Sequence, residues 1–395
     1  PGDLYQGFRA DYQNQYINPN ISLPQGDISL FTKDFKYPQV FRTNLATDFV
    51  LPYGIRTTVE AIYTKTLNNL YYTQINSNPT ERFRWTGTPD NRPVYANANL
   101  FNQYSGVYLA ANTSKGYSYN LAVSFAKEFD FGLNATVAYS FNDAYSLAEN
   151  TSSQNSSQWR GQVHQFSRND PAYGRSDFAA GHRVITALNY RFNWTRDRNN
   201  ATTVSLFMNA QSGTPYSYVM GGANNVMTER GSTGRNRTLA YIPASRNEIN
   251  LVPVGNLTAD QQWTNLSNYI ENSKYLSSRR GKYAEKNGAW APFVAIFDIG
   301  IRQDVGMNIG GQRHRLQLSA DIMNIANMLN PEWGVQYVVP GDFNNYELYN
   351  FAGYEADGTT PRFNYTGTQT NNDSFNIAGL TSRWRMQFGV RYIFN

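Results

Sequence analysis

The sequence predicts an all-β chain, a transmembrane antiparallel β-barrel, from three observations. These are strand segments with alternating apolar residues, short turns that alternate with long polar connections, and many aromatic but few charged residues. The alternation is clearest in residues 381–395, where successive strand side chains would form one aromatic face and one polar, cationic face. A soluble sandwich could place such an aromatic face on a core, whereas a membrane barrel places it against lipid.

The first two predicted hairpins show the pattern over long stretches. One has strands at 44–51 and 55–75, joined by the turn Pro52-Tyr53-Gly54. The other has strands at 117–125 and 133–141 around a turn at 130–132, and its alternation is the clearest among the hairpins. Both strands of this second hairpin reach the ~9–11 residues that cross a bilayer at the tilt of a barrel.

Two further hairpins follow in the chain. Residues 184–194 return through 204–208, and residues 297–304 return through 315–322. With the closing strand and a first strand at 4–16, we expect about ten strands, an even number as bacterial barrels usually have. Additional strand segments are expected at 105–112 and 333–339.

The connections between these strands alternate between short and long. The long polar ones are at 76–115, 147–181, 214–292 and 326–380. Outer-membrane barrels have short periplasmic turns and long extracellular loops, whereas a soluble domain seldom carries several such long loops. The pattern therefore predicts an outer-membrane location, with the long loops extracellular and the C-terminus periplasmic.

The alternation assigns each strand residue to one of two faces. The apolar positions are predicted to face lipid, and the clearest are Leu121, Val123, Phe125, Leu133, Val137, Tyr139, Trp384, Phe388, Tyr392 and Phe394. A row of cations is predicted to face the lumen: Arg183, Arg191, Arg302, Arg315, Arg383, Arg385 and Arg391. These cations could attract an anionic solute, or they could pair with acids such as Asp298, Asp304 and Asp321 or with a plug.

Composition agrees with a wet, membrane-embedded sheet. Aromatic residues make up 15% of the chain and charged residues only 16%, against ~25% charged in typical soluble domains. There is no apolar run of about 18 residues, which excludes a transmembrane helix. The net charge of +5 is scattered, so nucleic acid is not an expected partner. The absence of cysteine fits an exported chain without disulfides.

Five segments carry a resemblance to a known family. They are Pro38–Leu45 with Leu51–Gly54, Gln211–Tyr218, Arg280–Asn287, Asp321–Asn330 with Trp333-Gly334, and Arg383–Phe394. In this order they resemble the C-terminal part of Oar-like TonB-dependent outer-membrane receptors, which are relatives of the SusC-type importers. The resemblance extends from about residue 38 to the end.

The resemblance implies the C-terminal half of a 22-stranded barrel, with the plug, the TonB-contacting box and the early strands not present in this chain. It implies energised uptake of a solute bound at the outer loops. The expected partners are outer-membrane lipid, the TonB complex through the absent N-terminal part, the barrel assembly machinery, and other outer-membrane or surface proteins. The alternatives are a structural or secretion-associated membrane anchor and, for a complete ten-strand barrel, a passive porin.

Ligand binding is expected in the aromatic loop at 214–292. The candidate residues are Tyr216, Tyr218, Tyr241, Trp263 and Tyr269, because aromatic rings and amides suit sugars and peptides. The alternative is that these rings pack the loops against one another. Asp321, Asn324, Asn327 and Asn330 could ligate calcium or could bond their own backbone at a strand end.

Nothing in the sequence predicts an enzyme. His164, His182 and His314 have no metal-binding spacing, and no nucleophile elbow or phosphate-binding loop is present. We therefore expect no catalytic residue, metal or cofactor.

Overall fold

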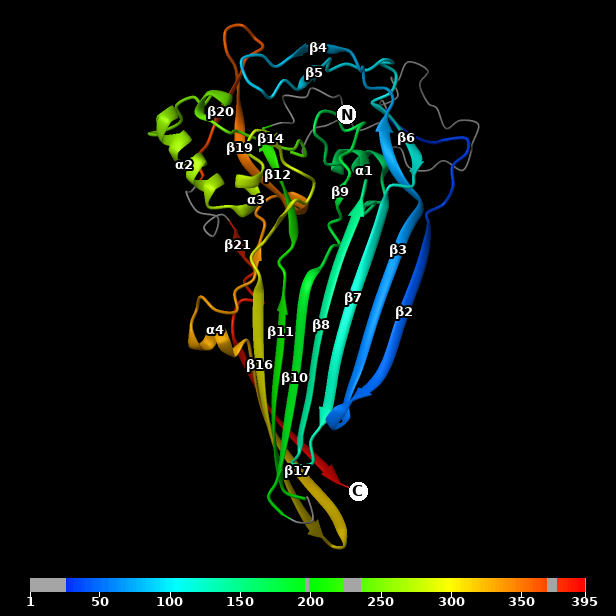
Figure 1. Cartoon of the computed structure of the whole chain (residues 1–395), viewed down its shortest axis with the longest axis vertical. Helices are drawn as coiled ribbons and strands as arrows, with labels where there is room; N and C mark the ends of the chain where they lie inside the picture. The colour runs from blue at the N-terminus through cyan, green and yellow to red at the C-terminus, as the bar shows by residue number, and fades with distance from the viewer. Residues whose placement is uncertain (1–25, 196–198, 223–235, 368–374, 395) are drawn as a thin grey trace, which may run out of the picture.

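The computed structural model describes residues 26–195, 199–222, 236–367 and 375–394. A tall curved sheet stands beneath a layer of folded loops (Figure 1). The strand predicted at 4–16 lies outside the described residues, so the predicted count of about ten strands stays a prediction.

The sheet is an antiparallel meander in which each long strand pairs with the next one along the chain. Its edges are β2 and β22, and among the described residues these two strands do not pair with one another. The long strands are β2 (Gln39–Leu51), β3 (Ile55–Gln74), β7 (Gly116–Glu128), β8 (Leu133–Ser146), β10 (Gly181–Asn193), β11 (Ala201–Gln211), β16 (Val294–Ile309), β17 (Gln312–Met323) and β22 (Arg385–Phe394).

Shorter strands extend the upper end of this sheet. β6 (Gly106–Thr113) pairs with the upper part of β3, at the segment where the sequence predicts an additional strand. β1 (Asp27–Phe31) runs parallel to β6, and β9 (Gly174–Arg175) pairs with β8. The segment predicted at 333–339 contains the two-residue strand β18 (Tyr337–Val338), which pairs with β21 (Asn376–Ile377).

The strand register defines two faces of the sheet. Directly paired residues lie on the same face, and one such row is Val59, Val123, Tyr139 and Val184. We call this side the apolar face. The other side, the polar face, contains the row Arg191, Thr203, Arg302, Ser319 and Gly389.

The connections differ in length at the two ends of the sheet. The short turns lie at the lower end, where the C-terminus also lies (Figure 1). In the β7–β8 turn, Gly132 adopts a φ of 97°, and a Cβ there would lie 2.7 Å from the carbonyl oxygen of Arg191. The long connections at 75–105, 147–180, 212–293 and 324–384 are close to the predicted ranges and lead from the other end.

The long connections fold into compact structure with its own small sheets and helices. β12 (Pro215–Gly221) pairs with β15 (Ala289–Trp290) and β19 (Asn345–Tyr354), and β19 pairs with β20 (Pro361–Asn364). The other short elements are β4 (Glu81–Arg84), β5 (Pro93–Tyr95), β13 (Tyr241–Ile242), β14 (Lys282–Tyr283), α1 (Asn155–Gly161), α2 (Ala259–Glu271), α3 (Lys274–Ser278) and α4 (Ile325–Leu329). These helices were not predicted, although Thr258 and Gln261 form a capping box at the start of α2.

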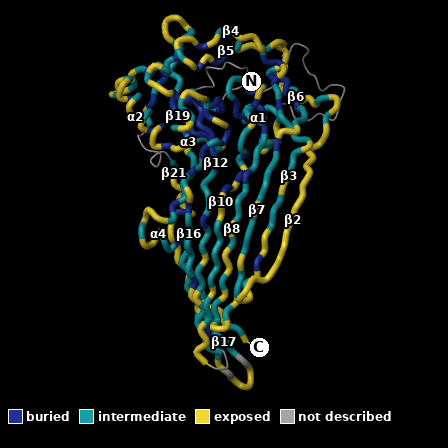
Figure 2. The backbone as a smooth tube through the Cα atoms, viewed as in Figure 1, coloured by how far each residue is buried: buried dark blue, intermediate teal, exposed yellow. Residues whose placement is uncertain are grey.

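The hydrophobic core of the described chain lies in this loop layer. Figure 2 shows the buried residues gathered there, while the long strands below are intermediate or exposed. Large apolar side chains on the apolar face, such as Leu45 and Phe388, are exposed. No described helix has the length and hydrophobicity needed to span a membrane.

Candidate functional site

The tyrosines predicted to bind a ligand lie inside the loop core. Tyr216, Tyr218 and Tyr269 are buried, and the hydroxyls of Tyr216 and Tyr218 are 2.7 Å apart. Burial raises the pKa of the Tyr218 and Tyr269 hydroxyls above the usual value. Tyr241 is also buried and donates to Glu248, and Trp263 packs against the same core. Packing of the loops, the alternative in the sequence analysis, describes these surroundings, and ligand binding by these rings stays a prediction.

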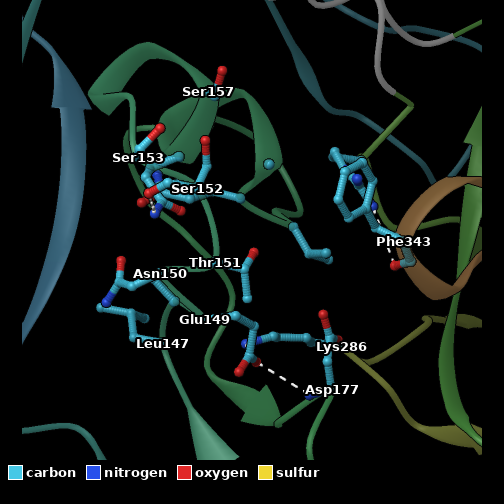
Figure 3. A pocket seen from close by; sticks show the side chains of 16 residues that line it. Leu147, Glu149, Asn150, Thr151, Ser152, Ser153, Ser157, Asp177, Lys286 and Phe343 are labelled. Carbon is cyan, nitrogen blue, oxygen red and sulfur yellow. Dashed lines mark hydrogen bonds and ion pairs between the residues drawn. The ribbon is translucent and has the colours of Figure 1, made fainter.

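A cavity of about 380 Å³, lined by both polar and apolar groups, lies beside this core (Figure 3). Residues 147–153, which follow β8, and the α1 region form one side, and Phe343 and Arg237 form another. Figure 3 places Glu149, Asp177 and Lys286 together at one end, with Thr151 between them and the Ser152–Ser153 segment. The volume falls in the range of about 300–1,000 Å³ typical of small-molecule sites.

Hydrogen bonds to β3 fix the α1 side of the cavity. The side-chain amide of Gln162 accepts from the Tyr72 backbone N–H and donates to the Tyr72 carbonyl, both at 2.9 Å. The buried Trp159 donates its indole N–H to Asn169 at 2.8 Å. At the upper end of β3, the Gln162 side chain thus forms the backbone hydrogen bonds that a neighbouring strand would otherwise form. These bonds hold the α1 side of the cavity against the sheet.

A buried ion pair forms one end of the cavity. Lys286 Nζ lies 2.9 Å from Glu149 Oε1 and also donates to the carbonyl of Ser146. Glu149 accepts from the hydroxyls of Ser146 and Ser176. Burial raises the pKa of Glu149, but Lys286 and these hydroxyls outweigh burial and hold it below its usual value.

The neighbouring carboxyl has the opposite shift. Burial, together with the charge of Glu149, raises the pKa of Asp177. Asp177 accepts from the side-chain amide of Asn287 at 2.6 Å, and the Asn287 backbone N–H donates to Ser217 Oγ at 2.8 Å. Lys286 and Asn287 therefore connect the 212–293 loop to the 147–180 loop.

The opposite wall combines a cation with an aromatic ring. The buried Arg237 guanidinium lies 4.8 Å from the centre of the Phe343 ring. Behind it, the Nδ1–H of the buried His164 donates to the Gln162 carbonyl, and its Nε2 accepts from the Thr238 hydroxyl. Burial, with additional repulsion from nearby arginines, holds the pKa of His164 well below its usual value, so this imidazole is neutral at pH 7.

Two further hollows lie against the polar face of the sheet. One of about 230 Å³ shares Ala148 and Glu149 with the first cavity and is lined by Thr64 and Ser118 of that face. Another of about 190 Å³ is lined lower down by Glu60 and Arg183. The polar face thus offers hydrogen-bonding groups at successive levels below the loops.

The register places the predicted strand cations together. Arg183, Arg191, Arg302, Arg315, Arg385 and Arg391 all occupy the polar face, and Arg383 lies just before β22. Arg191 lies 3.3 Å from Asp304 and Arg302 lies 3.6 Å from Asp321, while Arg183 donates to Asn209. Two of the cations therefore have acidic neighbours, as the pairing alternative describes.

The predicted lipid-facing residues are also brought together. Leu121, Val123, Phe125, Leu133, Val137, Tyr139, Phe388, Tyr392 and Phe394 share the apolar face, and Trp384 directly precedes β22. On that face, His182 and His314 form hydrogen bonds with Tyr139 and Tyr392. Contact of these side chains with lipid stays a prediction.

The three asparagines among the candidate calcium residues bond to the backbone, while Asp321 lies beside Arg302. The side-chain amides of Asn324 and Asn327 donate to the carbonyls of Gly334 and Trp333. Within the described part of the chain, no group of three or more acidic, histidine or cysteine residues could hold a metal. The asparagines therefore shape the chain after β17.

Comparisons with known proteins agree with the membrane pattern. A family model described as "Outer membrane beta barrel domain" matches residues 1–335. A search of curated proteins finds no match. The outer membrane transporter YddB from Escherichia coli is similar in structure over 94% of this chain, with a TM-score of 0.39 and 10% identity, and this chain spans 34% of that one. Because the family model covers most of its length, the chain belongs to the outer membrane β-barrel domain family and is located in the outer membrane.

Proposed function

We propose that this chain forms the wall and extracellular surface of a TonB-dependent receptor that binds a solute beneath its loops for energised uptake. The observation that supports this proposal most is the cavity in the loop layer, which shares Ala148 and Glu149 with a hollow on the polar face. A separate hollow lies lower on the same face. A solute bound there would lie above the lumen. TonB would act through an N-terminal part of the protein.

The lining of the cavity favours a polar solute without net charge. Its charged residues balance, with Lys286 and Arg237 opposite in sign to Glu149 and Asp177. Thr151, Ser152, Ser153 and Ser157 add hydroxyl groups, and Asn150 and Gln158 add amides. Such groups both donate and accept hydrogen bonds, as the hydroxyls of oligosaccharides and the amides of short peptides require.

The proposed orientation has the loop layer outside the cell and the short turns in the periplasm. It rests on the separation of long and short connections at opposite ends of the sheet. The apolar face would contact outer-membrane lipid. The closing strand would be presented to the barrel assembly machinery.

Binding by purified full-length protein in detergent tests the site. The protein is dialysed against maltooligosaccharides in one arm and tripeptides in another, and retained solute is measured by mass spectrometry. We expect one pool to be retained, and Thr151→Trp, which fills the cavity, to weaken that retention at least about tenfold. Thr80→Trp is the matched control, because Thr80 is an exposed threonine of the loop layer that does not line the cavity.

Uptake of the retained solute then tests the mechanism. We expect cells with the full-length protein to accumulate it only when TonB is present. Equal accumulation without TonB would indicate a porin. Retention of neither pool, or unchanged retention by the folded Thr151→Trp variant, would contradict ligand binding in this cavity.

A further inference from the structure

A small apolar projection stands on the outside of the sheet below the loop layer. After β17, Asn324 adopts a left-handed conformation with a φ of 53°, and the chain turns into α4. Figure 1 shows α4 projecting sideways from the wall beside β16. Residues 325–338 and 376–384, which pack together here, are named the α4 knob.

Hydrogen bonds give the α4 knob a defined shape. The backbone N–H of Asn324 donates to Asp298 at 2.7 Å, which fixes the knob to β16. The Asn324 amide donates to the Gly334 carbonyl at 2.9 Å, and the Gln336 N–H donates to Ser382 Oγ at the same distance. Pairing of β18 with β21 joins the two segments. These hydrogen bonds and strand pairs therefore give the knob a defined fold.

The knob exposes several large apolar side chains. Leu329 is 70% exposed, Leu380 79%, Trp333 56% and Trp384 46%. The loop layer above fully buries comparable side chains, such as Tyr218 and Leu266. Large apolar side chains exposed together on one small projection of a folded protein mark contact with a partner or a membrane.

The position of the knob identifies its neighbour. Trp384 immediately precedes β22, whose Met386 and Phe388 continue along the apolar face. Ten residues separate Trp384 from Phe394, which at ~3.3 Å per residue and a tilt of about 40° is about 25 Å along the membrane normal. The apolar band of an outer-membrane barrel is also about 25 Å tall. If Phe394 marks one border of the band, Trp384 marks the other.

The chemistry of the knob suits that border. Tryptophan concentrates at membrane interfaces, because its ring is apolar while its indole N–H prefers a polar neighbour. Lipid is therefore the occupant that continues from the apolar face onto the knob.

We propose that the α4 knob inserts Leu329, Trp333, Leu380 and Trp384 into the lipid interface at the loop end of the barrel. The knob would anchor the barrel in depth at the segment where β17 and β22 emerge from the membrane. This inference concerns membrane contact and does not depend on which solute the cavity binds.

Fluorescence quenching by brominated lipid tests this insertion. The full-length protein is reconstituted in vesicles of phosphatidylcholine with a 6,7-dibromostearoyl chain and in unbrominated vesicles. The contribution of each tryptophan is the difference between the parent protein and its Trp→Phe variant. We expect the Trp333 and Trp384 contributions to lose most of their intensity in the brominated vesicles. Trp263 of α2, partly exposed in the loop layer, is the matched control and should keep its intensity.

A second measurement covers the case in which a tryptophan variant does not fold. The chain has no cysteine, so a spin label at Leu380→Cys reports one position within it. We expect greater collision with oxygen than with a water-soluble nickel chelate at this label, and the reverse at Asp357→Cys in an exposed turn. Unquenched Trp333 and Trp384, or a label at 380 that collides mainly with the chelate, would overturn the proposal and would leave a protein partner as the occupant.

Discussion

Glu149 and Lys286 are the residues on which the shape of the candidate site depends most. They lie in different loops, more than a hundred residues apart in the sequence. The side chain of Glu149 is 13% exposed and that of Lys286 is 4% exposed. A buried charge that loses its partner keeps its desolvation cost without the compensating attraction. The pair therefore connects two loops and makes their packing sensitive to a single substitution.

Glu149→Gln should destabilise the loop layer by about 3 kcal/mol at pH 7, since it leaves the buried Lys286 ammonium without its direct ion-pair partner. Hydrogen exchange of the loop amides in the full-length protein measures this loss. Glu81→Gln is the control, because the Glu81–Arg84 pair is exposed and should contribute little.

The pH dependence of the stability difference between the parent protein and Glu149→Gln is an independent test of the same ion pair. The pKa of Glu149 is lower in the folded protein than in the unfolded chain. The Glu149 carboxylate therefore contributes fully to stability when the pH is above the pKa of the unfolded chain. This contribution is lost as the pH falls through the pKa of the folded protein. The difference between the parent protein and Glu149→Gln should therefore shrink below a pH of about 4.3. A difference that is the same at all pH values would contradict a stabilising charge on Glu149.

The sequence could not predict this site, because its residues have no common spacing. Glu149 and Asp177 lie in one connection, Arg237 and Lys286 in another, and the four meet only through loop packing. Lys286 and Asn287 do lie in the segment Arg280–Asn287, one of those that carry the family resemblance. That segment was the available signal, but its partners in the 147–180 loop were not visible without the fold.

The long hairpins, in contrast, follow directly from local sequence. In β7 and β8 a period of two places Val123 and Phe125 beside Tyr139 and Val137 on one face, and the structure has that register. A shift by one residue would exchange the two faces, so the alternation fixes the register strongly. The loop helices lack such a signal because their apolar residues pack on a core assembled from several connections.

Adjacent residues of β8 provide a matched test of the two faces. Val137→Lys places a charge on the apolar face, whereas Ala138→Lys places it on the polar face one residue away. We expect Val137→Lys to destabilise the folded barrel by about 2–4 kcal/mol, because lipid cannot solvate the ammonium near the middle of the bilayer. Urea titration of full-length protein in lipid vesicles measures the change.

Ala138→Lys should lower the stability much less, because its side chain points to the hydrated face. Equal losses for the two lysine variants would contradict the division between a lipid-facing and a water-facing side. A larger loss for Ala138→Lys would reverse the two faces.

The sheet and the loop layer differ in where their apolar side chains lie. The long strands expose their apolar face, whereas the core lies in the connections at one end (Figure 2). This arrangement is unsuited to water alone and fits a wall in lipid beneath a folded surface domain. It also explains why mean composition is polar while the strand pattern indicates a membrane protein.

Surface labelling of an epitope at each end of the sheet tests this arrangement most directly. One epitope is inserted after Gly358, in the exposed turn between β19 and β20, and the other between Gly310 and Gly311 in the β16–β17 turn. Exposed turns of this kind tolerate insertions. On intact cells, antibody should label the epitope at 358, while the epitope at 310 should be labelled only after the outer membrane is permeabilised. Labelling of the epitope at 310 on intact cells, with none at 358, would contradict the orientation proposed for the loops.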